Sequence, residues 1–204
     1  MELEEVIRKR RSIRKFKDKS VPEEYIDLLI EAGRRAPSGG NSQNWLFGLV
    51  TEKEKIHELS EAAGGQEWIS QAPLIIAFCT ELKKDFRELS EEDFELQVDK
   101  ERFGEELIEH LKEFPNQRKV ALLFENCNPL LPGEHIFLKA VDLGLGACWV
   151  GYLDIEKASS VLDLPLRYKC FFLMPIGYPD EEPVEKDLKG KEEITFKNSY
   201  QLDR

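Results

Sequence analysis

Residues 36–45 form a dense run of small and polar side chains that could bind a ligand. Pro37 fixes its own φ and disfavours a helical conformation at Ala36, so a helix leading into this run should end there. Gly39 and Gly40 would let the backbone approach a ligand closely. The polar side chains, more than a tight turn uses for itself, are Ser38, Asn41, Ser42, Gln43 and Asn44. The run fits a binding loop, although an exposed Asn- and Gly-rich connection would have the same composition.

A second stretch, residues 8–19, reverses the charge of the chain locally. It contains eight Lys and Arg residues and one acid, whereas the whole protein has a formal net charge of -11. One interpretation is a solvated helix C-terminus, where the macrodipole favours cations. The other is an anion site, because Arg10, Arg11 and Arg14 offer planar charged groups that suit phosphate and Ser12 adds a hydroxyl.

The sequence contains no pattern of side chains that would carry catalysis by itself. It has no nucleophile elbow, no P-loop, no dinucleotide-binding glycine motif and no zinc-protease motif. The four cysteines and three histidines are widely spaced, which favours buried thiols and packing or surface histidines over a metal site or a disulfide. We therefore predict no catalytic side chain and no metal, and we expect a phosphate-bearing cofactor to supply the chemistry.

Length and composition narrow the class of protein. A chain of 204 residues with 41% hydrophobic content fits one domain, or one domain with an excursion. The acidic sequence pI of about 4.9 disfavours a nucleic-acid partner or an anionic membrane surface. No apolar run has the length of a transmembrane helix, and the acidic first residues do not resemble a signal peptide. We expect a cytoplasmic protein.

Helices and strands must alternate to position the two polar stretches. Apolar spacing predicts helices over residues 2–11, 21–35, 52–63, 134–143 and 155–162. Short apolar runs predict strands at 45–50, 74–79, 147–152 and 168–177, and residues 194–196 are strand-like. Four or five strands alternating with helices predict an α+β or α/β sandwich around one sheet.

The strongly charged segment over residues 83–125 is interpreted as a variable helical excursion, which could serve as a lid or as a dimer-packing arm. Residues 120–124 could extend its last helix or form a strand. Phe103, Phe114 and Phe124 are candidate lid aromatics, although packing in a core is the favoured role for each.

Several motifs together resemble the nitroreductase family of FMN-dependent NAD(P)H oxidoreductases. They are RRSIRKF at residues 10–16, Val21-Pro22, APSGGNSQNW at residues 36–45, Ala72-Pro73 and GLGACWVG at residues 144–151. They follow the family's order and spacing, and the resemblance extends to Pro179. The chain is therefore identified as a member of this family, with residues 1–204 expected to form a single FMN-binding domain.

The resemblance implies specific cofactor-binding residues. The FMN phosphate and the polar edge of the ring system would be held by Arg10, Arg11, Ser12 and Arg14. The flavin would be reached from the partner subunit by Pro37, Ser38, Gly39, Asn41 and, close by, Gln43. The ring nitrogen that exchanges hydride would lie against the backbone of Trp149, Val150 and Gly151. A further basic pair at the phosphate would be Lys189 and Lys191.

The resemblance also implies an assembly and an activity. The family's fold is an α/β/α sandwich around a mainly antiparallel sheet, built as an intertwined homodimer with FMN at the subunit interface. NADH or NADPH would reduce the flavin, and a small electron-poor acceptor such as a nitroaromatic or a quinone would then take its place in a ping-pong mechanism. Three alternatives stay open: a flavin storage or sensor protein, a specialised flavin reaction such as dehalogenation, and an anion-binding regulatory domain that binds no flavin.

Overall fold

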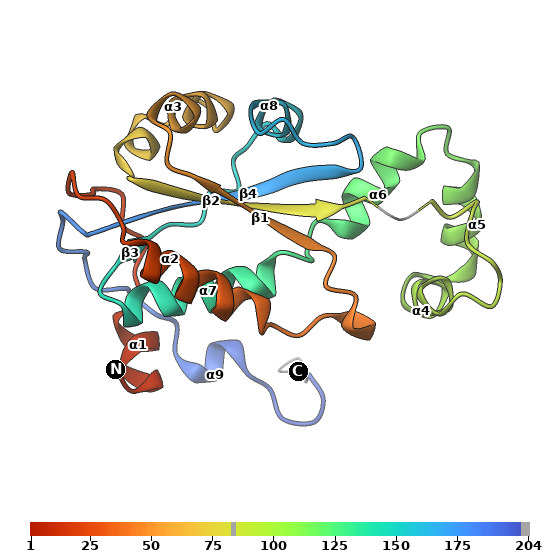
Figure 1. The fold of residues 1–204 in the computed structure, drawn as a ribbon. Helices are drawn as coiled ribbons and strands as arrows, with labels where there is room; N and C mark the ends of the chain where they lie inside the picture. Colours follow the sequence, from red (N-terminus) through yellow and green to blue (C-terminus); the bar gives the residue numbers. More distant parts are fainter. Residues whose placement is uncertain (83–84, 201–204) are drawn as a thin grey trace.

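An antiparallel sheet lies at the centre of the protein in the computed structural model, which describes residues 1–82 and 85–200. Its strands, in the order β1-β2-β4-β3, are β1 (Trp45–Val50), β2 (Leu74–Glu81), β4 (Tyr168–Gly177) and β3 (Gly146–Ala147) (Figure 1). The predictions for β1, β2 and β4 are confirmed. The prediction of a strand over residues 147–152 is wrong in extent, because after the short β3 only Val150 pairs again, with Leu173.

Helices cover both faces of the sheet (Figure 1). Side chains alternate along β2, so Leu74, Ile76 and Phe78 pack in one apolar cluster while Ile75, Ala77 and Cys79 pack in another. The first cluster also takes side chains from α2 (Glu23–Arg34) and α7 (Leu130–Asp142). The second takes side chains from α3 (Lys53–Ala62), α8 (Ile155–Val161) and the 3-10 turn η2 (Glu67–Gln71). The described chain is thus an α+β fold with three layers.

A β-bulge interrupts the pairing of β2 with β4. Phe78 lies opposite Phe172, whereas Cys79 lies opposite Cys170, so Phe171 is the extra residue on β4. Because neighbouring side chains on a strand point to opposite faces, the extra residue returns Cys170 to the face that Cys79 occupies.

The excursion forms three helices beside the sandwich, and its first two residues, 83 and 84, lie outside the described residues. The helices are α4 (Phe94–Phe103), α5 (Glu105–Glu113) and α6 (Gln117–Glu125), which contains residues 120–124. They enclose their own apolar cluster of Phe86, Leu96, Ile108 and Val120. Phe124 packs edge-on against Phe86 and Phe103, as core packing predicts. Phe103 and Phe114 are each 43% exposed, so core packing was the wrong expectation for these two.

The remaining elements flank the sandwich. Helix α1 (Leu3–Lys9) precedes the basic stretch, and the short α9 (Lys191–Ile194) lies in the C-terminal tail. The strand-like interpretation of residues 194–196 is therefore wrong. The predicted start of the helix at Glu134 is also wrong, because α7 begins four residues earlier. Within the described ranges, no helix is long and apolar enough to cross a membrane.

Candidate cofactor-binding site

The basic stretch begins where α1 ends. Arg10 follows the last turn of the helix, and its guanidinium carbon lies 5.1 Å from the centroid of the Phe137 ring on α7. The guanidinium carbon of Arg14 lies 5.8 Å from the Trp68 ring. Each guanidinium is thus held over an aromatic side chain, a contact that restrains the cation without neutralising it.

Backbone pairing holds the basic stretch against β3. The N–H of Ile13 donates to the carbonyl of Ala147 at 3.0 Å, and Ser12 pairs with Ala147 in a parallel bridge. A Cβ at Gly146 would lie only 2.7 Å from Cγ1 of Ile13, so a larger residue there would push the two segments apart. This approach brings Ser12 close to the segment that continues from β3 to Gly151.

A segment after β4 closes the other side of the stretch. The Glu181 carboxylate accepts hydrogen bonds from the N–H groups of Arg14 at 2.5 Å and Lys15 at 3.1 Å, and the N–H of Asp180 donates to the Lys15 carbonyl at 3.0 Å. Glu181 therefore binds the backbone of the stretch, while the Arg14 guanidinium lies over the Trp68 ring.

We call Arg10, Arg11, Arg14 and Lys186 the cation cluster. In residues 1–82 and 85–200, none of the four has an acidic oxygen within the 4.0 Å of a salt bridge, whereas Arg34 and Arg35 both pair with Glu31 at 2.6 Å. The pKa of the exposed Lys186 is lowered, first by the charge of Arg10 and further by slight desolvation and by the charge of Arg11. Positive charge held together without neutralisation is the electrostatic signature of an anion site.

The buried thiol of Cys148 marks the centre of this arrangement. Burial raises its pKa, while Arg14, a hydrogen bond from Ser12 and the charge of Arg10 act in the opposite direction. Arg10, Ser12 and Arg14 therefore all lie near one thiol, and Arg11 is their neighbour in the chain.

The segment Trp149–Gly151 follows directly. The Trp149 indole packs against the rings of Phe78 and Phe172, with centroids 5.0 Å and 5.6 Å away. The N–H of Val150 already donates to the Leu173 carbonyl at 2.9 Å, which removes it as a donor to a ligand. Of the three predicted residues, only Trp149 and the exposed Gly151 therefore remain as candidates to donate a backbone N–H to the flavin ring.

The polar loop follows α2 and includes the 3-10 turn η1 (Gly39–Asn41). Its shape is set locally, because the Ser38 hydroxyl accepts from the N–H of Gln43 at 3.1 Å. Asn41 and Gln43 have φ values of 56° and 45°, which non-glycine residues rarely adopt. Such unusual backbone often accompanies a binding role. Pro37, Gly39, Asn41 and Gln43 are exposed and Ser38 is half-buried.

Within this chain the basic stretch leads into the N-terminal end of α2, and the polar loop follows its C-terminal end (Figure 1). The helix has 12 residues, which at a rise of about 1.5 Å per residue gives a length of about 18 Å. The predicted residues Arg10, Arg11, Ser12 and Arg14 thus come before α2 in the chain, and the predicted loop residues come after it.

A cavity of about 650 Å³ lies where the loop meets the excursion, lined by Gly39, Gly40 and Ser42 on one side and by side chains of α4 to α6 on the other. The Asn44 amide donates to the Glu125 carboxylate at 3.0 Å, and Asn128 donates to the same group. Sequence reasoning missed Glu125, because a single acid in a charged helical segment carries no pattern.

The C-terminal tail places a third lysine near the arginines, in addition to the predicted pair. Lys186 is the tail residue that the charges of Arg10 and Arg11 affect, while Lys189 and Lys191 lie further along an exposed segment, with Lys191 opening α9. The three lysines lie within six residues of one another in a polar tail, so the sequence carries no signal that distinguishes them.

Comparison with known proteins adds independent information. A sequence profile described as "Nitroreductase family" matches residues 7–128 and 130–178. A Bacillus subtilis protein named FMN reductase [NAD(P)H] is 38% identical over 192 residues, covering 93% of this chain and 71% of that protein. A Methanothermobacter thermautotrophicus protein named "Putative NADH dehydrogenase/NAD(P)H nitroreductase" is 27% identical and covers 95% of this chain and 86% of its own.

Solved structures share the fold. The structure of the NfrA1 nitroreductase from B. subtilis superposes with a TM-score of 0.73 at 26% identity, over 98% of this chain and 76% of that one. The NADPH:FMN oxidoreductase of Vibrio harveyi, solved in complex with NAD⁺, gives a TM-score of 0.72 at 24% identity, over 99% of this chain and 79% of that one. Because its sequence identity is only 24%, the similarity to the Vibrio harveyi structure shows a shared fold and nothing more.

Proposed function

The chain belongs to the nitroreductase family of oxidoreductases, and on that premise we propose that it is an FMN-dependent enzyme that passes reducing equivalents from NADH or NADPH to a small electron-poor acceptor, such as a nitroaromatic or a quinone. The observation that carries the proposal is the cation cluster beside Ser12, which has the charge and the hydrogen-bonding groups that a flavin phosphate requires. The name of the B. subtilis relative supports both the flavin and the donor.

The phosphate end would be bound by Arg10, Arg11, Ser12 and Arg14, with Lys186 as an added cation. Arginine groups can each donate two parallel hydrogen bonds to phosphate oxygens, and the aromatic contacts of Arg10 and Arg14 limit the conformational freedom that binding would remove. Lys189 and Lys191 would contribute charge from further along the tail.

At the ring end, bound FMN would supply the hydride chemistry. The chain's own task is to hold one face of the ring and leave the other open. Trp149 is fixed by its aromatic neighbours, so the N–H of Trp149 or Gly151 would be presented in a defined position to the ring nitrogens. Donor and acceptor would then use the same open face in turn, which is the ping-pong order.

The complete site would be shared between two subunits of a homodimer. The basic stretch precedes α2 in the chain and the polar loop follows it, so we expect residues 37–43 to serve the flavin of the partner. The C-terminal tail also exposes apolar side chains that an isolated subunit would leave in water, namely Val184, Leu188, Ile194 and Phe196. Light scattering tests this: a monomer that retains full FMN would contradict a shared site.

The function itself is tested by an anaerobic absorbance spectrum of the FMN-loaded protein, recorded before and after NADH and then NADPH. Bleaching of the flavin bands by either nucleotide, followed by recovery on adding a quinone or a nitroaromatic, is the expected result. A bound flavin that both nucleotides leave oxidised would refute the reductase and favour storage or a specialised reaction. Failure to bind FMN at all would leave only an anion-binding role for the cluster.

A further inference from the structure

Two buried cysteines lie directly opposite each other on neighbouring strands, away from the cation cluster. Cys79 on β2 and Cys170 on β4 are cross-strand partners, and their side chains are 1% and 0% exposed within the same apolar cluster. Their pairing depends on the bulge at Phe171, since Cys170 would lie opposite Thr80 and point to the other face of the sheet if Phe171 itself paired with Cys79.

The strand register of the pair is compatible with a disulfide. Directly opposite residues of an antiparallel pair have Cα atoms about 4.5 to 5.5 Å apart, which lies inside the range of about 4.4 to 6.8 Å that disulfides span. Both cysteines are free in this structure. The Cys79 thiol is within hydrogen-bonding reach of Cys170 and, together with burial, raises the pKa of the Cys170 thiol well above its ordinary value.

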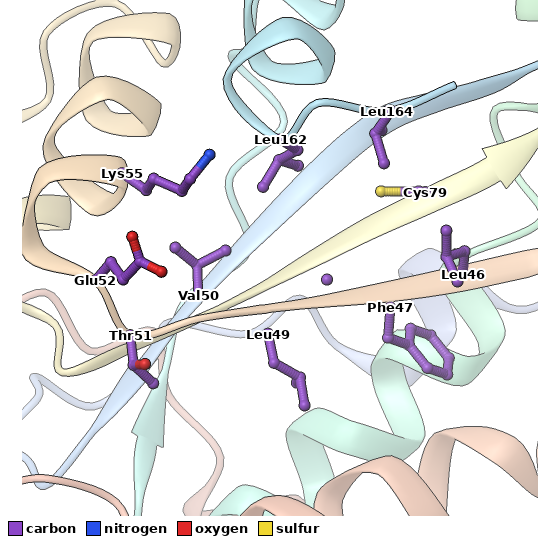
Figure 2. Close-up of a pocket in the computed structure, with 11 residues that line it drawn as sticks. Leu46, Phe47, Leu49, Val50, Thr51, Glu52, Lys55, Cys79, Leu162 and Leu164 are labelled. Atoms are coloured by element: carbon purple, nitrogen blue, oxygen red, sulfur yellow. The ribbon is translucent and has the colours of Figure 1, made fainter. Parts of the chain in front are cut away.

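A cavity gives small molecules a route to one of the two thiols. It has a volume of about 300 Å³ and is bounded by β1, by Lys55 of α3 and by Leu162 and Leu164 after α8 (Figure 2). Cys79 projects from β2 between Leu164 and Leu46 in this view and belongs to the lining, whereas Cys170 does not. The Lys55 ammonium donates to the Val161 carbonyl at 2.8 Å and to Asp163 at 3.1 Å, which ties α3 to the far wall of the cavity.

We propose that Cys79 and Cys170 form a modification site for small two-electron oxidants of the peroxide class, which enter through the cavity of Figure 2 and convert the pair into a cross-strand disulfide. The assignment rests on strand register and cavity lining and is independent of the flavin function.

The reaction balances with hydrogen peroxide as the oxidant. The Cys79 sulfur attacks one peroxide oxygen, an S–O bond forms as the O–O bond breaks, and water leaves with the thiol proton, which gives a sulfenic acid at Cys79. The Cys170 sulfur then attacks that sulfur, so the S–S bond forms as the S–O bond breaks. The Cys170 proton leaves with the departing hydroxide as a second water. Two thiols lose two electrons, and one peroxide gains them.

The test uses the full-length protein treated with hydrogen peroxide, then denatured, alkylated and mapped by mass spectrometry. Cys79 and Cys170 should leave the pool of free thiols together, with a linked peptide pair that joins them and has a mass lower by two hydrogen atoms. Dithiothreitol should restore all four thiols. The midpoint of urea unfolding should rise in the oxidised form and return on reduction, because a bridge between residues 79 and 170 constrains a long loop of the unfolded chain.

Two variants separate this pair from general thiol oxidation. Cys127→Ser, which removes the exposed cysteine, should still lose two thiols and give the same linked peptides. Cys170→Ser should give no linked pair. The wild-type peptide map alone decides the question if that variant does not fold. The proposal would be overturned if Cys79 and Cys170 both remained free thiols after Cys127 had been oxidised. A disulfide that joins Cys79 to any other cysteine would also overturn it.

Discussion

Removing the two aromatic-supported arginines of the cation cluster is the most direct perturbation of the proposed phosphate site. The variant is Arg10→Ala with Arg14→Ala. The apoprotein should stay folded, because neither side chain belongs to the apolar core and neither has a salt-bridge partner among the described residues. The lost stacking contacts cost about 0.5 to 1 kcal/mol each at partly exposed positions. Removing Arg10 also relieves its repulsion of Lys186, which offsets part of that loss.

The effect on cofactor binding should be much larger. Hydrogen bonds to charged groups contribute about 1.5 to 3 kcal/mol each, so two lost arginine–phosphate contacts correspond to about 3 to 6 kcal/mol. That free energy weakens binding by about two to four powers of ten. Arg14 is exposed and Arg10 only half-buried, so solvent screening places the expected value toward the lower end of that range.

The assay is a titration of apoprotein with FMN, followed by quenching of flavin fluorescence, with urea unfolding measured in parallel. Arg167→Ala is the matched control, because it also removes one exposed arginine but lies outside the cation cluster. The Arg167 Nε atom is 3.7 Å from Oε1 of Glu81. The control should bind FMN as the wild type does. A double variant that binds FMN with unchanged affinity, or that purifies with full flavin, would refute the assignment of the phosphate to Arg10 and Arg14.

Three further predictions test other parts of the structure. Gly133→Ala should lower the free energy of unfolding by about 1 to 3 kcal/mol, because a Cβ there would lie 2.1 Å from the Trp149 indole; Gly39→Ala, which meets open space, should change urea unfolding far less. Acetic anhydride should modify Lys186 more slowly when FMN is bound, whereas equal protection of the exposed Lys157 on α8 would contradict a local effect. The pKa of Glu31 is lowered from 4.5 to about 2 by hydrogen bonds from Arg34 and Arg35, so its contribution to stability is present above pH 4.5 and is lost as the pH falls toward 2. The difference in urea midpoint between wild type and Glu31→Gln should shrink across that window, and a difference that persists undiminished at lower pH would rule out this ion pair as its source.

Much of the fold follows from local sequence. The apolar runs at residues 45–50 and 168–177 are strands with the predicted bounds. The second run suits a strand covered on both faces, whereas β1 is an edge strand on which Leu46 and Leu49 are exposed. The helix predicted over 52–63 forms as Lys53–Ala62 for an equally local reason, the apolar spacing of Ile56 and Leu59. The predictions that failed lie where tertiary contacts compete with weak local preference. The strand at 147–152 is cut short where Trp149 leaves the ladder to pack on Phe78 and Phe172.

The candidate site divides in the same way. The sequence by itself determined the family motifs and the concentration of Arg10, Arg11, Ser12 and Arg14, because these residues are near neighbours in the chain. Only the tertiary structure decided that Lys186 lies within range of Arg10 and that Val150 has already used its N–H. The opposition of Cys79 and Cys170 is likewise tertiary, since a single extra residue at a bulge sets which face a side chain occupies. Local patterns record what a segment prefers, whereas register and long-range proximity depend on segments that meet only after the chain has folded.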